Sequence, residues 1–169
     1  MFIDETGLSE RPHRVRTWSP RGQTPILQMR FNWHQLSAIA GLTFWNFYFK
    51  LVPGTFNAKR VVEFLQQLRE QIKRPLLVIW DGLPAHRSRL VRDYVDATAG
   101  AIQIERLPAY APELNPVEYL WAHWKQHELA NFCPKHFGEL SAFARNKLRR
   151  SQRRPTIIAA CWRQAKLPI

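Results

Sequence analysis

The most constraining feature of this sequence is a continuous apolar run, Leu76-Leu77-Val78-Ile79-Trp80, that ends at Asp81. An apolar run without polar alternation is typical of a strand buried on both faces of an α/β sheet. Segments 57–74 and 88–99, on either side of it, carry apolar residues at helical spacing. The alternation of helix, buried strand and helix predicts an α/β domain with a mixed sheet flanked by helices.

The other segments extend this prediction to the whole chain, and we expect residues 1–169 to form a single domain. Further strands are expected at 2–5, at 102–106 and, as a hairpin with its bend near 43–46, within 35–51. Further helices are expected from 116 or 117 to about 131, over 135–151 and, briefly, after Pro155. Residues 9–25, with three prolines, are expected to form a loop or a ragged hairpin.

Positive charge dominates the composition. The chain has 25 Lys and Arg residues against 13 Asp and Glu residues, a formal net charge of +12. This excess indicates a polyanionic partner, with nucleic acid favoured over a membrane surface or a ribosome-like role. Hydrophobic residues make up 46% of the sequence, which is enough for a core and too much for a disordered chain.

The sequence also indicates where the protein works. No apolar segment is long enough to span a bilayer, and the acidic N-terminal residues do not resemble a signal peptide. Cys133 and Cys161 are isolated and predict neither a disulfide framework nor a zinc site. We therefore expect a reduced, cytoplasmic protein without a membrane partner.

Three carboxylates are candidates for a metal site. Asp81 closes the buried strand, Asp4 lies in the first strand, and Glu118 lies in the first turn of the helix after a proline-rich loop. Ligands bind beyond the carboxyl ends of strands in open α/β sheets, and hard oxygen ligands select Mg²⁺ or Mn²⁺. Each acid also has an ordinary alternative: a turn cap for Asp81, an arginine partner for Asp4, and compensation of the helix dipole for Glu118. Position alone leaves both interpretations open.

The segments around these acids resemble the three catalytic blocks of DDE transposases, in the mariner-like branch of bacterial insertion sequences. The three blocks are Phe2–Gly7, Val78–His86 and Leu107–Glu118. The third is the most specific, because Leu-Asn-Pro stands just ahead of its acid. The 36 residues between Asp81 and Glu118 are close to the family's interval, and 16–25 resembles a stretch found after the first acid in this branch.

The resemblance implies a ribonuclease-H-like fold with two Mg²⁺ ions, replaceable by Mn²⁺, at Asp4, Asp81 and Glu118. It implies hydrolysis at transposon ends, followed by strand transfer into target DNA without a covalent protein–DNA intermediate. A homodimer associated with the bacterial nucleoid is the expected assembly, although the sequence shows no dimer motif. Similar elements insert at TA dinucleotides.

Two departures from the family pattern stand out. Gly82 occupies a position where many relatives have asparagine. Relatives also carry a helix-turn-helix region before the first acid, whereas three residues precede Asp4 here. The expectation is a fragment, or the downstream half of a split transposase that works with a separate upstream DNA-binding polypeptide. The alternatives are another ribonuclease-H-like nuclease, such as a junction resolvase, and a non-catalytic DNA-binding remnant.

Several neighbours of the acids are candidate supporting residues. His86 is expected either to contact the scissile phosphate or order the metal shell, or to bond a loop carbonyl. Asn115 could orient the loop or cap the helix of Glu118, and the cap, with an indirect effect on catalysis, is the favoured expectation. Lys125 shares a helix face with Glu118, which predicts either a phosphate contact near the metals or a solvated lysine. Glu5 should face away from Asp4 and is expected to be structural.

A basic run near the C-terminus is the candidate DNA-backbone contact, with a solvated helix face as the alternative. Its basic residues are Arg145, Lys147, Arg149, Arg150, Arg153 and Arg154. The basic loop 11–21 is a second candidate for the same role. Contacts of this kind position DNA without selecting a sequence.

Overall fold

The structure is a computed structural model that describes residues 1–29, 34–108 and 111–167. Within these ranges a five-stranded sheet has the order β3-β2-β1-β4-β5. Its strands are β1 (Phe2–Ser9), β2 (Gln35–Leu42), β3 (Phe47–Pro53), β4 (Leu76–Trp80) and β5 (Ile102–Arg106). The first three pair antiparallel, and β4 and β5 run parallel to β1. The predicted mixed sheet is confirmed.

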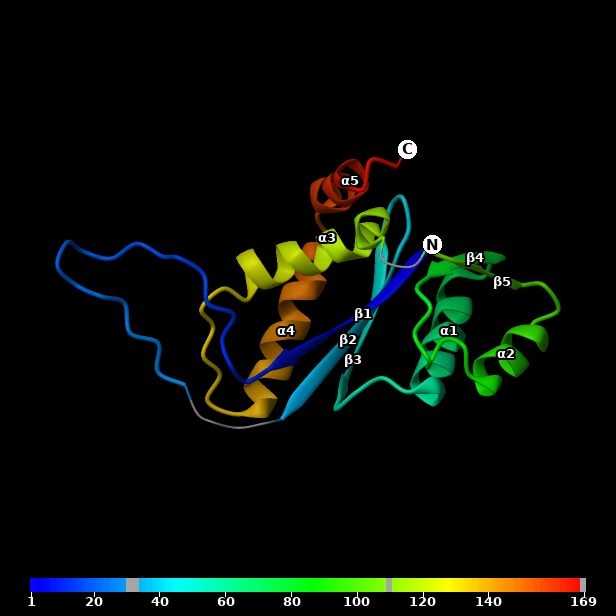
Figure 1. Ribbon diagram of the computed structural model, residues 1–169, viewed down its shortest axis with the longest axis horizontal. Coiled ribbons are helices and arrows are strands. Elements are labelled where there is room, and N and C mark those ends of the chain that lie inside the picture. Colours follow the sequence, from blue (N-terminus) through cyan, green and yellow to red (C-terminus); the bar gives the residue numbers. More distant parts are fainter. Residues whose placement is uncertain (30–33, 109–110, 168–169) are drawn as a thin grey trace.

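Helices pack against both faces of this sheet (Figure 1). On one side lie α1 (Ala58–Ile72) and α2 (Arg89–Asp96), and on the other lie α3 (Pro116–His123), α4 (Phe137–Gln152) and α5 (Pro155–Gln164). Each side buries its own apolar cluster against the sheet. Residues alternate between the clusters along β1: Phe2 belongs to the cluster under α3, and Ile3 to the cluster under α1. The sheet therefore separates two cores.

Local signals set several of the element boundaries. The side chain of Asn57 caps α1 by accepting from Arg60 N at 3.0 Å. This helix ends at Lys73, whose φ of 53° is left-handed. Ser88 caps α2, as Val91 N donates to its hydroxyl at 3.3 Å. The helices predicted within 57–74 and 88–99 are thus confirmed.

Two elements differ from the sequence expectation. β1 continues to Ser9 because β2 pairs with it along its whole length, which overrides the weak strand preference of Gly7. The helix predicted to reach about residue 131 is α-helical only to His123, and a π-helical turn, η2 (Trp124–Glu128), follows. In that turn Leu129 N donates to Trp124 O at 2.9 Å.

Residues 10–29 form an extended arm, the blue segment that leaves the body of the molecule in Figure 1. Its base is anchored by a bridge between His13 and Ala130 and by Asn131, whose side chain bonds the backbone N–H and C=O of Val15, each at 2.9 Å. Trp18 on the arm is fully exposed. Of the two forms predicted for 9–25, the structure shows the loop. No described helix has the length and apolar character needed to cross a membrane.

Candidate active site

Asp4 and Asp81 lie side by side on neighbouring parallel strands. Phe2 of β1 pairs with Ile79 of β4, and each aspartate lies two residues further along its own strand direction. Because side chains two residues apart point to the same face, both carboxylates reach the edge where β4 ends. The register of β1 and β4 thus brings together two acids that are distant in sequence.

Glu118 approaches the same edge from α3. Pro116 occupies the first position of this helix, and Asn115 caps it by accepting from Val117 N at 3.1 Å. The predicted cap is confirmed. The start of the preceding loop is held by Leu107 N, which donates to Trp80 O at 2.8 Å. Ala109 and Tyr110 of the third block lie outside the described residues.

All three acids line one cavity of about 690 Å³. Glu118 is exposed and Asp81 is half-exposed, whereas Asp4 is only 7% exposed. The buried carboxylate of Asp4 accepts a hydrogen bond of 2.9 Å from Trp121 Nε1. Burial, followed by the negative charges of Glu118 and Glu5, raises the pKa of Asp4 to about 8. The protein itself therefore stabilises the ionised form of this carboxylate poorly.

The donor set fits a hard divalent cation in its chemistry. Carboxylate oxygens are the ligands that Mg²⁺ and Mn²⁺ prefer, and a cation would supply the positive charge that Asp4 lacks. In the described ranges, however, no three His, Cys, Asp or Glu side chains are grouped closely enough to hold one ion together. The case for a divalent cation at these residues therefore rests on the cavity that the three acids share and on the uncompensated charge of Asp4.

His86 lies behind Asp81 and is nearly fully buried. Its Nδ1 is 2.9 Å from Asp81 Oδ1 and 3.3 Å from the Asp81 carbonyl, and its Nε2 is 2.8 Å from Glu5 Oε1. The ring stacks on Trp80 with centroids 4.2 Å apart. Burial lowers the pKa of His86, but the hydrogen bond and charge of Glu5, together with Asp81, outweigh it, and the net pKa is raised. The loop-carbonyl contact expected for His86 is thus present beside two carboxylate contacts.

Comparison with known proteins identifies the family. The family model of DDE superfamily endonucleases matches residues 1–140. The chain belongs to this family. No curated protein is similar enough to the sequence to match it.

The fold of this DDE endonuclease is similar to that of solved Mos1 transposase structures. They include the Mos1 strand transfer complex (23% identity, TM-score 0.68), the Mos1 mariner paired end complex with Mn (21%, 0.69) and the catalytic domain of Mos1 mariner transposase (18%, 0.59). These matches cover 98%, 98% and 99% of this chain and 50%, 53% and 83% of the Mos1 chains, respectively. The chain thus spans about half the length of the Mos1 chains in the two complexes. The likeness shows the ribonuclease-H-like fold.

Two residues of this DDE endonuclease join the site without a sequence prediction for that role. Trp121 is buried and also donates to Asp4. Arg87 is the cationic side chain among the described residues that line the cavity. Its position one residue after His86 was the available signal. Gly82 also lines the cavity, and a Cβ added there would meet no described atom within 4 Å.

Lys125 lies away from the acids. It lines a separate cavity of about 270 Å³ beyond the far end of β1, together with Arg11 and His13 of the arm. About two helical turns separate it from Glu118, and it lies in the π-helical turn η2. The structure therefore places Lys125 beside the predicted basic loop and outside the acid cavity.

The basic run divides into two groups. Glu128 forms ion pairs with Lys147 at 3.1 Å and with Arg154 at 3.5 Å, which compensate part of the run internally. Within the described chain, the remaining arginines form no ion pair, and three of them are exposed; the three are Arg149, Arg150 and Arg153. Arg145 is half-buried. The exposed members are the ones free to meet a polyanion.

Proposed function

We propose that this DDE endonuclease is the catalytic domain of a DNA transposase, with Asp4, Asp81 and Glu118 as its metal-holding acids. The observation that carries the proposal is the convergence of these three acids on one cavity in a chain of net charge +12. Acids at the centre hold cations, while basic residues around them hold the DNA backbone. The DNA bound would be transposon ends and target DNA.

Two Mg²⁺ or Mn²⁺ ions bound at these acids would activate the attacking oxygen and stabilise the leaving oxygen of a phosphodiester. Asn115 fixes the start of α3 and so the approach of Glu118. Arg87 is placed to contact a phosphate that enters the cavity. Hydrolysis at the transposon end frees a 3′-hydroxyl, which then attacks the target strand.

The basic surface supplies affinity that does not depend on sequence. Lys125 and the exposed arginines of the basic run contact phosphates in this proposal. Since the chain spans about half of the Mos1 chains in the complexes it resembles, we infer that recognition of the ends comes from a further DNA-binding region or a separate polypeptide. A homodimer would bring two active sites to two ends.

Substitution of the acids tests the site. Asp81→Ala and Glu118→Gln should abolish nicking of a DNA substrate in Mg²⁺ or Mn²⁺. Glu113→Gln is the matched control, because Glu113 is an exposed acid of the same loop that does not line the cavity. If both acid variants cut as well as the parent, the assigned site is wrong.

A joining assay separates the transposase from a ribonuclease-H-like nuclease of the junction-resolvase kind. The parent should join a pre-cut 3′ end to a target duplex, and cleavage without any joined product would favour the nuclease. Binding without either reaction would favour the non-catalytic remnant.

The phosphate contacts of the basic run are tested by a salt titration of DNA binding. Arg150→Gln should lower the salt slope by about 1, whereas Lys147→Gln should change it less. Salt-independent binding would rule out the phosphate role.

A further inference from the structure

A chain of polar contacts links β1 to the carboxylate of Asp81 through His86. Glu5 Oε1 and Asp81 Oδ1 lie 2.8 and 2.9 Å from the two ring nitrogens of His86. Nε2 forms a hydrogen bond with Glu5, while Nδ1 forms a hydrogen bond with the Asp81 carbonyl oxygen at 3.3 Å and lies at ion-pair distance from Asp81 Oδ1. We propose that Glu5 and His86 are positioning residues that fix one oxygen of Asp81 and thereby present the other oxygen to the cation. This inference rests on the metal-binding role proposed above for Asp81.

The orientation of the imidazole is set by stacking on Trp80 and by the backbone of its own turn. The ring of His86 lies at 6° to the ring of Trp80, which is itself 1% exposed. The backbone N–H of His86 donates to Leu83 O at 3.0 Å, which fixes the turn that carries the ring. The donor that reaches Asp81 is therefore held in place before any ligand binds.

The carboxylate of Asp81 needs such a restraint. Its side chain is 42% exposed and follows the last residue of β4, where the sheet no longer confines it. Oδ1 accepts from Leu83 N at 3.1 Å and lies beside His86 Nδ1. Oδ2 has no hydrogen-bond partner in the described parts of the chain, and Asp81 lines the cavity that Asp4 and Glu118 line. Oδ1 is thus held by contacts within the protein, and Oδ2 is available to a ligand.

A contribution to folding stability does not explain why a glutamate is buried at position 5. Its side chain is 12% exposed, and its Oε2 is buried without a partner among the described residues. A buried carboxylate oxygen without a hydrogen bond costs folding free energy. The one contact that Glu5 makes through Oε1 is the contact that orients His86 toward Asp81. A role in the site accounts for this acid better than a structural role does.

The variant Glu5→Gln tests the proposal because it keeps the shape of the side chain and removes its charge. Loss of an outer partner of a metal ligand typically lowers metal affinity or activity about 10–100-fold. We expect Mn²⁺ to bind Glu5→Gln about tenfold more weakly than it binds the parent, measured by calorimetry on the DNA-free chain. Cleavage should recover at saturating Mn²⁺, since the three proposed ligands remain.

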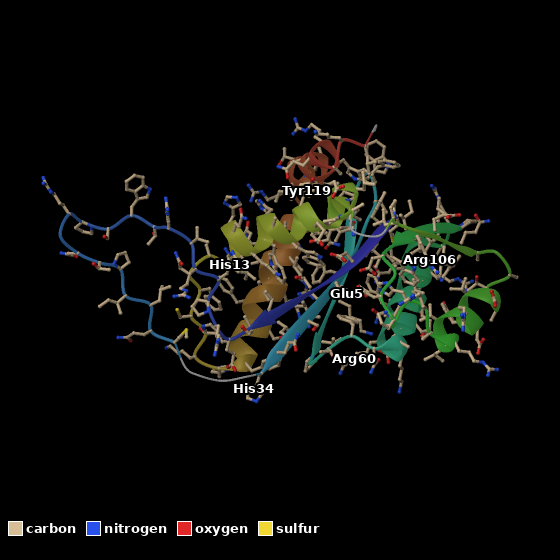
Figure 2. The ribbon with its side chains drawn as sticks, viewed as in Figure 1. Glu5, His13, His34, Arg60, Arg106 and Tyr119 are labelled. Atoms are coloured by element: carbon tan, nitrogen blue, oxygen red, sulfur yellow. The ribbon has the colours of Figure 1, made fainter. Side chains whose placement is uncertain are left out.

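The chain offers a matched control in a second glutamate–histidine pair. Glu10 is 3% exposed, and its Oε2 lies 3.2 Å from His34 Nδ1. Figure 2 shows His34 at the end of the sheet away from Glu5. Glu10→Gln should leave Mn²⁺ affinity unchanged. His86→Asn, which is too short to bridge two carboxylates, gives a second test with the same expected loss of affinity as Glu5→Gln.

The outcomes separate this inference from the proposed function. Mn²⁺ binding that needs Asp81 but is equally tight or tighter in Glu5→Gln and His86→Asn overturns the positioning role alone. Mn²⁺ binding that is the same in the parent and in Asp81→Ala overturns the assigned metal site and the positioning role together. Equal loss of affinity in Glu5→Gln and Glu10→Gln also overturns the positioning role, because it shows a general effect of lost charge.

Discussion

Asp4 and Glu5 are neighbours on β1, and the protein treats them in opposite ways. Asp4 faces α3, where its partner is the neutral indole N–H of Trp121. Glu5 faces the other core, where its partner is the imidazole of His86. One residue of sequence thus separates a carboxylate that accepts from an indole from one that is paired with an imidazole. The alternation of a β-strand is enough to give adjacent acids different environments.

The difference shows how one edge of a sheet can both favour cation binding and restrain a carboxylate that would bind the cation. The uncompensated charge of Asp4, close to Glu118, favours a bound cation. The compensated charge of Glu5 acts through His86 on Asp81, the next carboxylate of the cavity. We therefore expect substitutions of Asp4 to change both the pH dependence of stability and the affinity for cations strongly. Substitutions of Glu5 should change the affinity for cations by a smaller factor.

The largest expected effect is on the pH dependence of stability. The native state keeps the proton of Asp4 up to a pKa of about 8, whereas the unfolded state releases it near the ordinary value of 3.8. Stability from this group is therefore complete below about pH 4 and is lost as the pH rises toward 8. Asp4→Asn should match the parent at pH 4 and exceed its free energy of unfolding by several kcal/mol at pH 8, measured by urea unfolding without metal.

The difference between the two proteins isolates Asp4, because His86, whose raised pKa also lowers stability as the pH rises, is common to both. Glu5→Gln should keep most of the decrease in the free energy of unfolding that the parent shows between pH 4 and pH 8. Parallel stability curves for the parent and Asp4→Asn between pH 4 and pH 8 would contradict the contrast between the two acids.

Cation binding should give the next largest effect. At about 100 times its dissociation constant, Mn²⁺ should raise the free energy of unfolding of the parent by about 2.7 kcal/mol at pH 8, through binding to the native state. Asp4→Asn should show little of this rise, and Glu5→Gln a smaller rise than the parent at the same Mn²⁺ concentration. Thermal unfolding with and without Mn²⁺ measures both. A full rise in Asp4→Asn would place the cation elsewhere.

Removal of the indole donor should give the smallest effect. Trp121→Phe keeps most of the packing and removes the hydrogen bond to Asp4, which should lower stability by about 1.5 kcal/mol when Asp4 is ionised. Because that bond favours the charged form of Asp4, the loss should be small below about pH 8, where Asp4 is protonated, and should grow as the pH rises above 8. Trp124→Phe is the control, since the Trp124 indole is buried without a partner among the described residues. A loss that does not vary with pH would mean that packing alone is affected.

Much of the fold could be predicted from local sequence. The apolar run before Asp81, the helical periodicity after Asn57 and the cap at Asn115 are short-range signals, and the structure confirms each of them. The full length of β1 and the π-helical turn after His123 were not predicted. The first depends on pairing with β2, which lies outside the segment itself, so the residues of β1 alone do not predict it.

The sequence by itself determined the class of the sheet, the cap of α3 and the three blocks that carry the acids, because periodicity and capping act over a few residues. Only the tertiary structure decided which groups those acids meet. Glu5 and His86 are 81 residues apart, and Asp4 and Trp121 are 117 apart. Such contacts depend on the register of β1 with β4 and on the packing of α3 over the sheet. The fold also brings Glu128 to Lys147 and Arg154 of the basic run and leaves Arg149, Arg150 and Arg153 exposed.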